Sequence, residues 1–109
     1  MDSKGSELYE LNRLGALPTK NSGRGVHQKA DCIIYLGSEP MLSVDVKEYA
    51  ESYGVSVKSW AKVTTDAKQN RSEPMLHLAL GDSEPKTRVV CISEQMFLEF
   101  MECYREKYE

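Results

Sequence analysis

The chain has 109 residues, a formal net charge of −3 and three cysteines without CxxC spacing. This length predicts one domain over residues 1–109, with a core that oligomerisation would help to stabilise. The lack of a long apolar run or a signal-peptide pattern predicts a cytoplasmic protein without membrane contact. The cysteine pattern argues against a zinc site. The acidic balance excludes DNA binding by net charge alone, so any DNA affinity must come from a local patch.

The first predicted element is a helix from Glu7 to about Leu14, capped by Ser6 and ended by Gly15. Its leucines recur at helical spacing and define the buried stripe. Glu7 lies about 40° from the centre of that stripe and Glu10 about 100° away. Because Glu7 lies so close to the core, it is either a first-turn residue favoured by the helix dipole or a functional carboxylate.

Residues 16–19 predict a short edge strand, where proline is tolerated. Residues 20–29 then form a cationic loop with two glycines that leads directly to Asp31. Backbone amides and cations in such a loop can approach a phosphate closely, although an ordinary solvated loop explains the composition equally well. The candidate phosphate-contacting residues of this loop are Lys20, Arg24 and Lys29.

Two strands separated by turn residues follow the loop. Residues 32–36 are a short apolar run, typical of a strand buried on both faces. Residues 42–47 alternate between apolar and polar side chains, so Asp45 and Lys47 project to the same side of their strand.

The pairing of these strands decides where their polar residues lie. If the strands form a hairpin that pairs Leu36 with Leu42, Asp31 falls opposite Lys47 and diagonal to Asp45. Two carboxylates and a lysine then converge on one spot. The pattern therefore predicts a metal site with a cation beside it.

Ser56 is a predicted N-cap for a helix over residues 57–70, with apolar residues on one face and Lys58 and Lys62 on the opposite one. That cationic face is either solvent-exposed or in contact with DNA phosphates. Two further strands are predicted at residues 75–80 and 87–92.

Ser93 is predicted to cap a last helix with a broad apolar face that includes Phe100 and Tyr104. This face is wider than packing on one small sheet requires. We therefore expect part of it to be available for a dimer contact.

An acidic residue ahead of one strand and Asp-x-Lys on the next resemble the signature of the PD-(D/E)xK nucleases. The wider pattern resembles the Holliday-junction-resolvase branch, phage-encoded members in particular, over residues 5–92. That branch has a helix with a glutamate, a glycine, a Ser-Gly loop, the Asp, the (D/E)xK strand and a later helix. These stand here as Glu7 or Glu10, Gly15, residues 22–25, Asp31, residues 45–47 and residues 59–62.

The resemblance implies a restriction-endonuclease-like α/β fold, a mixed β-sheet flanked by helices, which the order of the predicted elements also favours. It implies a Mg²⁺-dependent endodeoxyribonuclease in which Mn²⁺ can substitute. The implied metal ligands are Asp31, Asp45, the carbonyl of Val46 and Glu7, with Glu10 in reserve. Lys47 would hold the attacking water or stabilise the transition state.

The implied partners are DNA, four-way junctions or other branched DNA in particular, and a second copy of the chain. The implied DNA-contacting residues are Lys20, Ser22, Arg24, Lys29, Lys58 and Lys62. If a virus encodes the chain, the expected location is the host cytoplasm. Two other interpretations stay open. One is a non-catalytic DNA-binding or phage accessory module with a nuclease-like fold. The other is a small structural or interaction domain in which Asp31, Asp45 and Lys47 form only a surface ion pair.

Overall fold

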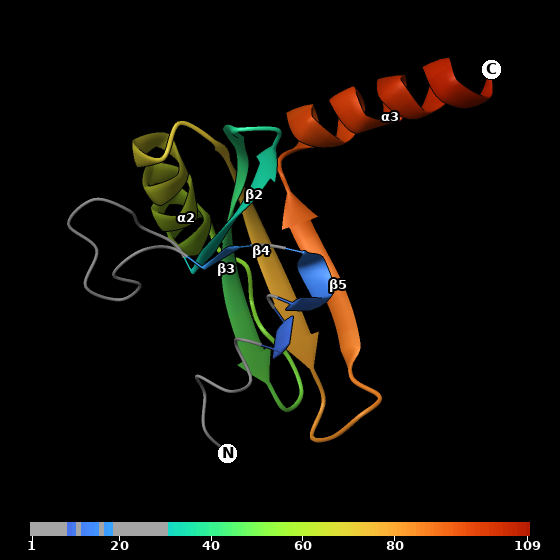
Figure 1. The fold of residues 1–109 in the computed structure, drawn as a ribbon. Helices are drawn as coiled ribbons and strands as arrows, with labels where there is room; N and C mark the ends of the chain where they lie inside the picture. The colour runs from blue at the N-terminus through green and yellow to red at the C-terminus, as the bar shows by residue number, and fades with distance from the viewer. Residues whose placement is uncertain (1–8, 11, 16, 19–30) are drawn as a thin grey trace.

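The computed structural model describes residues 9–10, 12–15, 17–18 and 31–109 of the chain. Residues 9–10 and 12–14 are helical. The later elements, drawn in Figure 1, are β1 (Leu17–Pro18), β2 (Cys32–Leu36), β3 (Glu39–Tyr49), α2 (Val57–Gln69), β4 (Glu73–Leu80), β5 (Thr87–Ile92) and α3 (Glu94–Tyr108).

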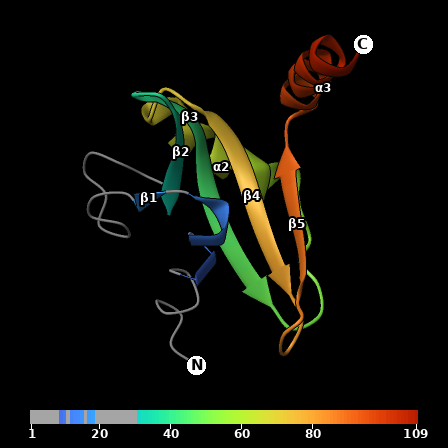
Figure 2. The ribbon, with the colours of Figure 1, turned by 45° about the vertical axis from the view of Figure 1, so that its right-hand side comes forward.

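The strands form one mixed sheet in the order β1-β2-β3-β4-β5. Neighbouring strands are antiparallel except for β3 and β4, which are parallel and joined through α2. A parallel pair needs such a crossover because its two strands run in the same direction. Figure 2 shows α2 on one side of β3 and β4 and the N-terminal helical residues on the other. The fold is therefore of the mixed α/β class.

The predicted register of β2 on β3 is wrong by two residues. Ile34 pairs with Leu42, and an irregularity after Ile34 brings Tyr35 opposite Pro40. The turn is shorter than predicted because Gly37 takes a φ of +65°, so that β3 already begins at Glu39. Continued by one residue, this register places Asp31 opposite Asp45 instead of opposite Lys47.

The two faces of the sheet carry separate cores. On the α2 face, which is the side covered by α2, Val63 of the helix packs with Leu76 and Leu78 of β4. On the opposite side, here called the N-terminal face, Val44 and Val46 of β3 belong to a core that Leu14 also contacts. Successive strand residues alternate between faces, so Asp45 lies on the α2 face and Val46 on the N-terminal face.

Local signals explain the helix boundaries. Gly15, with a φ of +65°, follows the N-terminal helical residues, as predicted. Ser56 and Ser59 form a reciprocal capping box that begins α2, and Ser93 Oγ accepts the N–H of Met96 to begin α3.

The strand run predicted to be buried on both faces is buried only at its start. Cys32 is inaccessible, whereas Leu36 is 70% exposed because β2 leaves the covered part of the sheet.

Helix α3 projects from the end of β5 (Figure 1), and Met96 is its buried residue. No helix among the described residues is long and apolar enough to cross a membrane.

Candidate functional site

Asp31 is held against β3 by two hydrogen bonds. Its backbone N–H donates to the carbonyl of Val44 at 3.0 Å, and its Oδ2 accepts the backbone N–H of Val46 at 2.8 Å. Together with the register of β2 and β3, these bonds place Asp31 next to Asp45. One carboxylate oxygen of Asp31 is used in this way, and its position is set by strand pairing.

Asp45 is a buried carboxylate with an unusual environment. It is 7% exposed, and no described residue donates a hydrogen bond to it. Burial raises the pKa of Asp45 and the neighbouring charge of Asp31 raises it further, while Lys47 and Lys62 partly oppose the rise. An ionised Asp45 is therefore short of positive charge, which a bound cation would supply.

Lys47 lies two residues further along β3, half-buried and on the same α2 face as Asp45. The structure thus brings Asp31, Asp45 and Lys47 together on one face of two adjacent strands. Val46 directs its buried side chain to the N-terminal face, and its backbone N–H is already bonded to Asp31.

The predicted cations of the helix are both exposed. Lys58 lies in the first turn of α2, and Lys62 follows one turn later with its Nζ 3.1 Å from Asp66 Oδ2. The other predicted site residues, namely Glu7, Lys20, Ser22, Arg24 and Lys29, lie outside the described residues.

Glu10, the reserve metal carboxylate, lies on the other side of the sheet. His77 pairs in register with Val46 and shares its N-terminal face. Glu10 Oε1 accepts a hydrogen bond from His77 Nε2 at 2.6 Å, and Arg88 donates to Glu10 through Nε and Nη2. Glu10 is therefore separated from Asp45 by the sheet itself and serves as the anchor of the N-terminal helical residues.

The helix-wheel prediction for Glu10 was wrong. It placed Glu10 well away from the buried stripe, yet Glu10 is 1% exposed. Burial raises its pKa, but the hydrogen bonds from Arg88 and His77 outweigh burial and hold the pKa below the ordinary value. His77 Nδ1 is buried and has no hydrogen-bond partner among the described residues.

Sequence reasoning missed two polar features of the α2 face. Asp66 forms an ion pair with Lys62, and the side chain of Asp66 is only 13% exposed. Asn70 Nδ2 donates to the buried Ser43 Oγ at 3.0 Å, and Ser43 Oγ also contacts Ser72 Oγ. The i,i+4 spacing of Lys62 and Asp66 was the available signal for the first feature.

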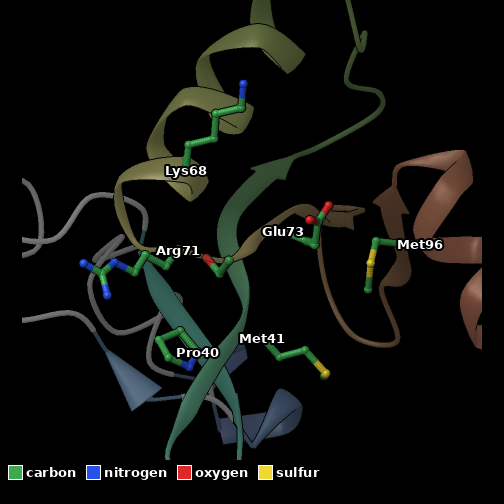
Figure 3. Close-up of a pocket in the computed structure, with 7 residues that line it drawn as sticks. Pro40, Met41, Lys68, Arg71, Glu73 and Met96 are labelled. Atoms are coloured by element: carbon green, nitrogen blue, oxygen red, sulfur yellow. The ribbon is translucent and has the colours of Figure 1, made fainter.

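An open groove of about 380 Å³ lies apart from these charges. Met41 and Met96 provide its apolar side, and Lys68 and Arg71 are among the residues at its edge. Figure 3 shows the side chains of Lys68 and Arg71 directed away from the two methionines. None of Asp31, Asp45 and Lys47 lines the groove, and its cations do not converge on a common point.

The described residues contain no group of three His, Cys, Asp or Glu side chains placed to hold a metal ion. The pair Asp31 and Asp45 still fits Mg²⁺, which is commonly bound through one or two carboxylates and keeps several waters.

Comparison with protein-family models, with curated proteins and with solved structures found no match to this chain.

Proposed function

We propose that the protein is a metal-dependent DNA endonuclease with a restriction-endonuclease-like fold. The observation that carries this proposal is Asp45, a buried carboxylate without a described hydrogen-bond donor, beside Asp31 and on the same face as Lys47. A mere surface ion pair does not require burial of a carboxylate that lacks such a donor, because burial without a partner costs stability. The central order β2-β3-α2-β4 and the parallel pairing of β3 with β4 support the proposed fold.

In this proposal Asp31 and Asp45 hold Mg²⁺, or Mn²⁺ in its place, together with the carbonyl of Val46. The bound ion would acidify a water and offset charge on the scissile phosphate. Asp31 Oδ2 is restrained by Val46 N–H, so the carboxylate is already oriented before the ion binds. Lys47 would orient the attacking water or stabilise the phosphorane-like transition state, because its ammonium projects to the face that carries both carboxylates.

The proposed substrate is branched DNA, four-way junctions in particular, and the proposed active unit is a cytoplasmic homodimer. Two incisions on symmetry-related strands need two identical sites, which a C₂ dimer provides. Helix α3 supports this part of the proposal, since Phe97, Phe100 and Tyr104 are 52%, 39% and 60% exposed. Exposed apolar patches of this kind usually mark protein contacts.

The test is cleavage of a synthetic four-way junction and of a linear duplex of the same sequence, with Mg²⁺ and with EDTA. We expect cleavage only with Mg²⁺, preferentially of the junction, and a dimer in analytical ultracentrifugation. Metal-dependent binding without cleavage would favour the non-catalytic DNA-binding or accessory module, which the net charge of −3 also favours. Absence of both cation binding and DNA binding would contradict the nuclease proposal.

A further inference from the structure

The side chains of α2 that face β3 form a second layer of charge over the proposed metal site. Lys62 and Asp66 lie one turn apart and form an i,i+4 ion pair with an Nζ–Oδ2 distance of 3.1 Å. The two partners differ sharply in accessibility, because the Lys62 side chain is 75% exposed and that of Asp66 13%. The carboxylate is thus held towards the sheet and the ammonium can leave it for solvent.

The contact between Asn70 and Ser43 sets the level of α2 over β3. Asn70 Nδ2 donates to Ser43 Oγ at 3.0 Å, at the point where α2 ends. Asp66 precedes Asn70 by four residues, which is about 6 Å along the axis of α2. Asp45 follows Ser43 by two residues, which is about 6.7 Å along β3. The two carboxylates therefore lie at the same level, one on the helix and one on the strand below it.

One step further along α2 and β3, a lysine on each element lies at the same level, as the two carboxylates do. Lys62 precedes Asp66 by one helical turn, and Lys47 follows Asp45 by two strand residues on the same face. The electrostatic effects agree with this placement. Asp45 and Asp31 both raise the pKa of Lys62, after the larger effect of its bond to Asp66, and Asp66 raises the pKa of Asp45.

The balance of charge in this layer leaves room for a cation. Asp31, Asp45 and Asp66 carry three negative charges when ionised, whereas Lys47 and Lys62 carry two positive ones. Asp45, itself 7% exposed and without a described hydrogen-bond donor, is the member that this arrangement leaves least compensated. A divalent ion at Asp31 and Asp45 would exceed the missing charge if both lysines stayed in place.

We propose that Asp66 and Lys62 are positioning residues that exchange roles when a divalent cation binds at Asp31 and Asp45. This inference rests on the proposed function and deepens it. In the cation-free protein Lys62 pairs with Asp66 and partly offsets the charges of Asp45 and Asp31. With the cation bound, Asp66 accepts a hydrogen bond from one of the waters that the ion retains, and Lys62 turns outwards to a phosphate of the DNA.

Outer-sphere contact through water agrees with the arrangement of the described carboxylates, which do not form a group of three direct ligands. It also agrees with the chemistry of Mg²⁺, which sheds its waters reluctantly. The long, exposed side chain of Lys62 suits the second role, because it can reach phosphate by charge without a fixed geometry.

Titration with Mn²⁺, followed through the paramagnetic resonance of the free ion, tests the exchange. Asp66→Asn should weaken Mn²⁺ binding about tenfold or more, because a group that orients the coordination shell is lost. Lys62→Gln should tighten it about three- to tenfold, because a competing positive charge is lost. The matched control Asp82→Asn, in the exposed turn after β4, should leave Mn²⁺ binding unchanged.

Opposite changes in Mn²⁺ affinity exclude a purely structural ion pair, because loss of either partner would then affect the site alike. The charges of Asp66 and Lys62 alone also give opposite signs, so the exchange itself is tested by the salt dependence described below. Changes of the same sign, or no change in either variant, would overturn the exchange while loss of binding in Asp45→Asn upheld the metal site. Undiminished Mn²⁺ binding in both Asp31→Asn and Asp45→Asn would overturn the metal site and the exchange together.

The outward movement of Lys62 has its own readout in the variant Lys47→Met, which we expect to bind DNA without cutting it. Adding Lys62→Gln to this variant should reduce the slope of log affinity against log salt by about one with Mn²⁺ present. Without Mn²⁺ the slope should stay the same, because Lys62 is then engaged with the carboxylates. Equal slopes with and without Mn²⁺ in the two variants would overturn the exchange.

Discussion

Two buried carboxylates on opposite faces of the sheet show how differently the same chemical group can be used. Glu10, on the N-terminal face, is 1% exposed and is saturated by hydrogen bonds from His77 and Arg88. Asp45, on the α2 face, is 7% exposed and receives no hydrogen bond from the described residues. The pKa of Glu10 is lowered and that of Asp45 is raised.

The difference separates a carboxylate with a structural role from one for which we propose a functional role. Glu10 joins the helical residues near the N-terminus to β4 and β5, and the ring of Tyr9 lies 5.5 Å below the Arg88 guanidinium. Its charge is compensated within the fold, so it has no need of an ion. Asp45 keeps a charge that the described part of the fold does not compensate, which is a cost that function can explain.

The largest expected effect is on DNA cleavage. Asp45→Asn and Asp31→Asn should each lower the Mg²⁺-dependent cleavage rate by about a thousandfold or more, because each removes a charged oxygen ligand at nearly constant volume. Glu10→Gln should retain cleavage at temperatures where the variant is folded. The measurement is single-turnover cleavage of a labelled four-way junction. Full activity in Asp45→Asn would contradict its functional role.

The second prediction concerns stability, for which Glu10 is the carboxylate expected to matter. Glu10→Gln should lower the free energy of unfolding by about 2–3 kcal/mol at neutral pH, because it leaves His77 without a charged acceptor and Arg88 with the exposed Glu84 alone. Urea denaturation followed by circular dichroism measures the change. Glu84→Gln, which removes the exposed second acceptor of Arg88, is the control and should have little effect.

The pH dependence of this effect follows from the sign of the pKa shift. Because the pKa of Glu10 is lower in the folded state, its stabilising contribution is present above the ordinary value of 4.5 and is lost as the pH falls through the folded-state value. The difference between Glu10→Gln and the unsubstituted protein should therefore shrink in acid. A difference that stayed constant across that range would show that packing, not charge, holds Glu10.

How far the sequence predicted these features depended on the range of the interactions. The bounds of β5 and the caps Ser56 and Ser93 were predicted correctly, because alternation and capping are local properties. The register of β2 on β3 was not, because one glycine at positive φ shortened the turn. Prediction of the helix face at Glu10 failed because its partners His77 and Arg88 lie 67 and 78 residues away.

The candidate site followed the same rule. The alternation of β3 correctly placed Asp45 and Lys47 on one face, which is a local property. Asp66 was missed because its proximity to Asp45 arises from the packing of α2, which the spacing of residues within α2 does not reveal. The metal ligation by Asp31 and Asp45 stays a prediction.

A third prediction applies the stability measurement to Asp45. With EDTA present at neutral pH, Asp45→Asn should raise the free energy of unfolding by about 1 kcal/mol, because it removes an uncompensated buried charge. The raised pKa means that ionisation penalises the folded state above the ordinary value of 3.8, whereas below that value the residue is protonated in both states. The gain should therefore vanish in acid.

The matched comparison is Asp31→Asn, which should not stabilise the protein, since Asp31 already accepts the N–H of Val46. Equal stabilisation by both substitutions would mean that repulsion between the two carboxylates, and not the environment of Asp45, sets the cost. Saturating Mg²⁺ should stabilise the unsubstituted protein more than it stabilises either variant.

The smallest expected effect concerns Lys58, which lies on the first turn of α2 and is exposed. If this turn contacts a DNA phosphate, Lys58→Ala should weaken binding uniformly across sequences and lower the slope of log affinity against log salt by about one. Fluorescence anisotropy of a labelled junction at several salt concentrations measures both quantities.

Lys107→Ala in α3 is the matched control, because α3 projects away from α2 (Figure 1) and this exposed lysine should leave the slope unchanged. Equal slopes for Lys58→Ala and the unsubstituted protein would return Lys58 to an ordinary solvated surface. The proposed chemistry would then depend on Asp31, Asp45 and Lys47, with DNA contacts from the rest of the chain.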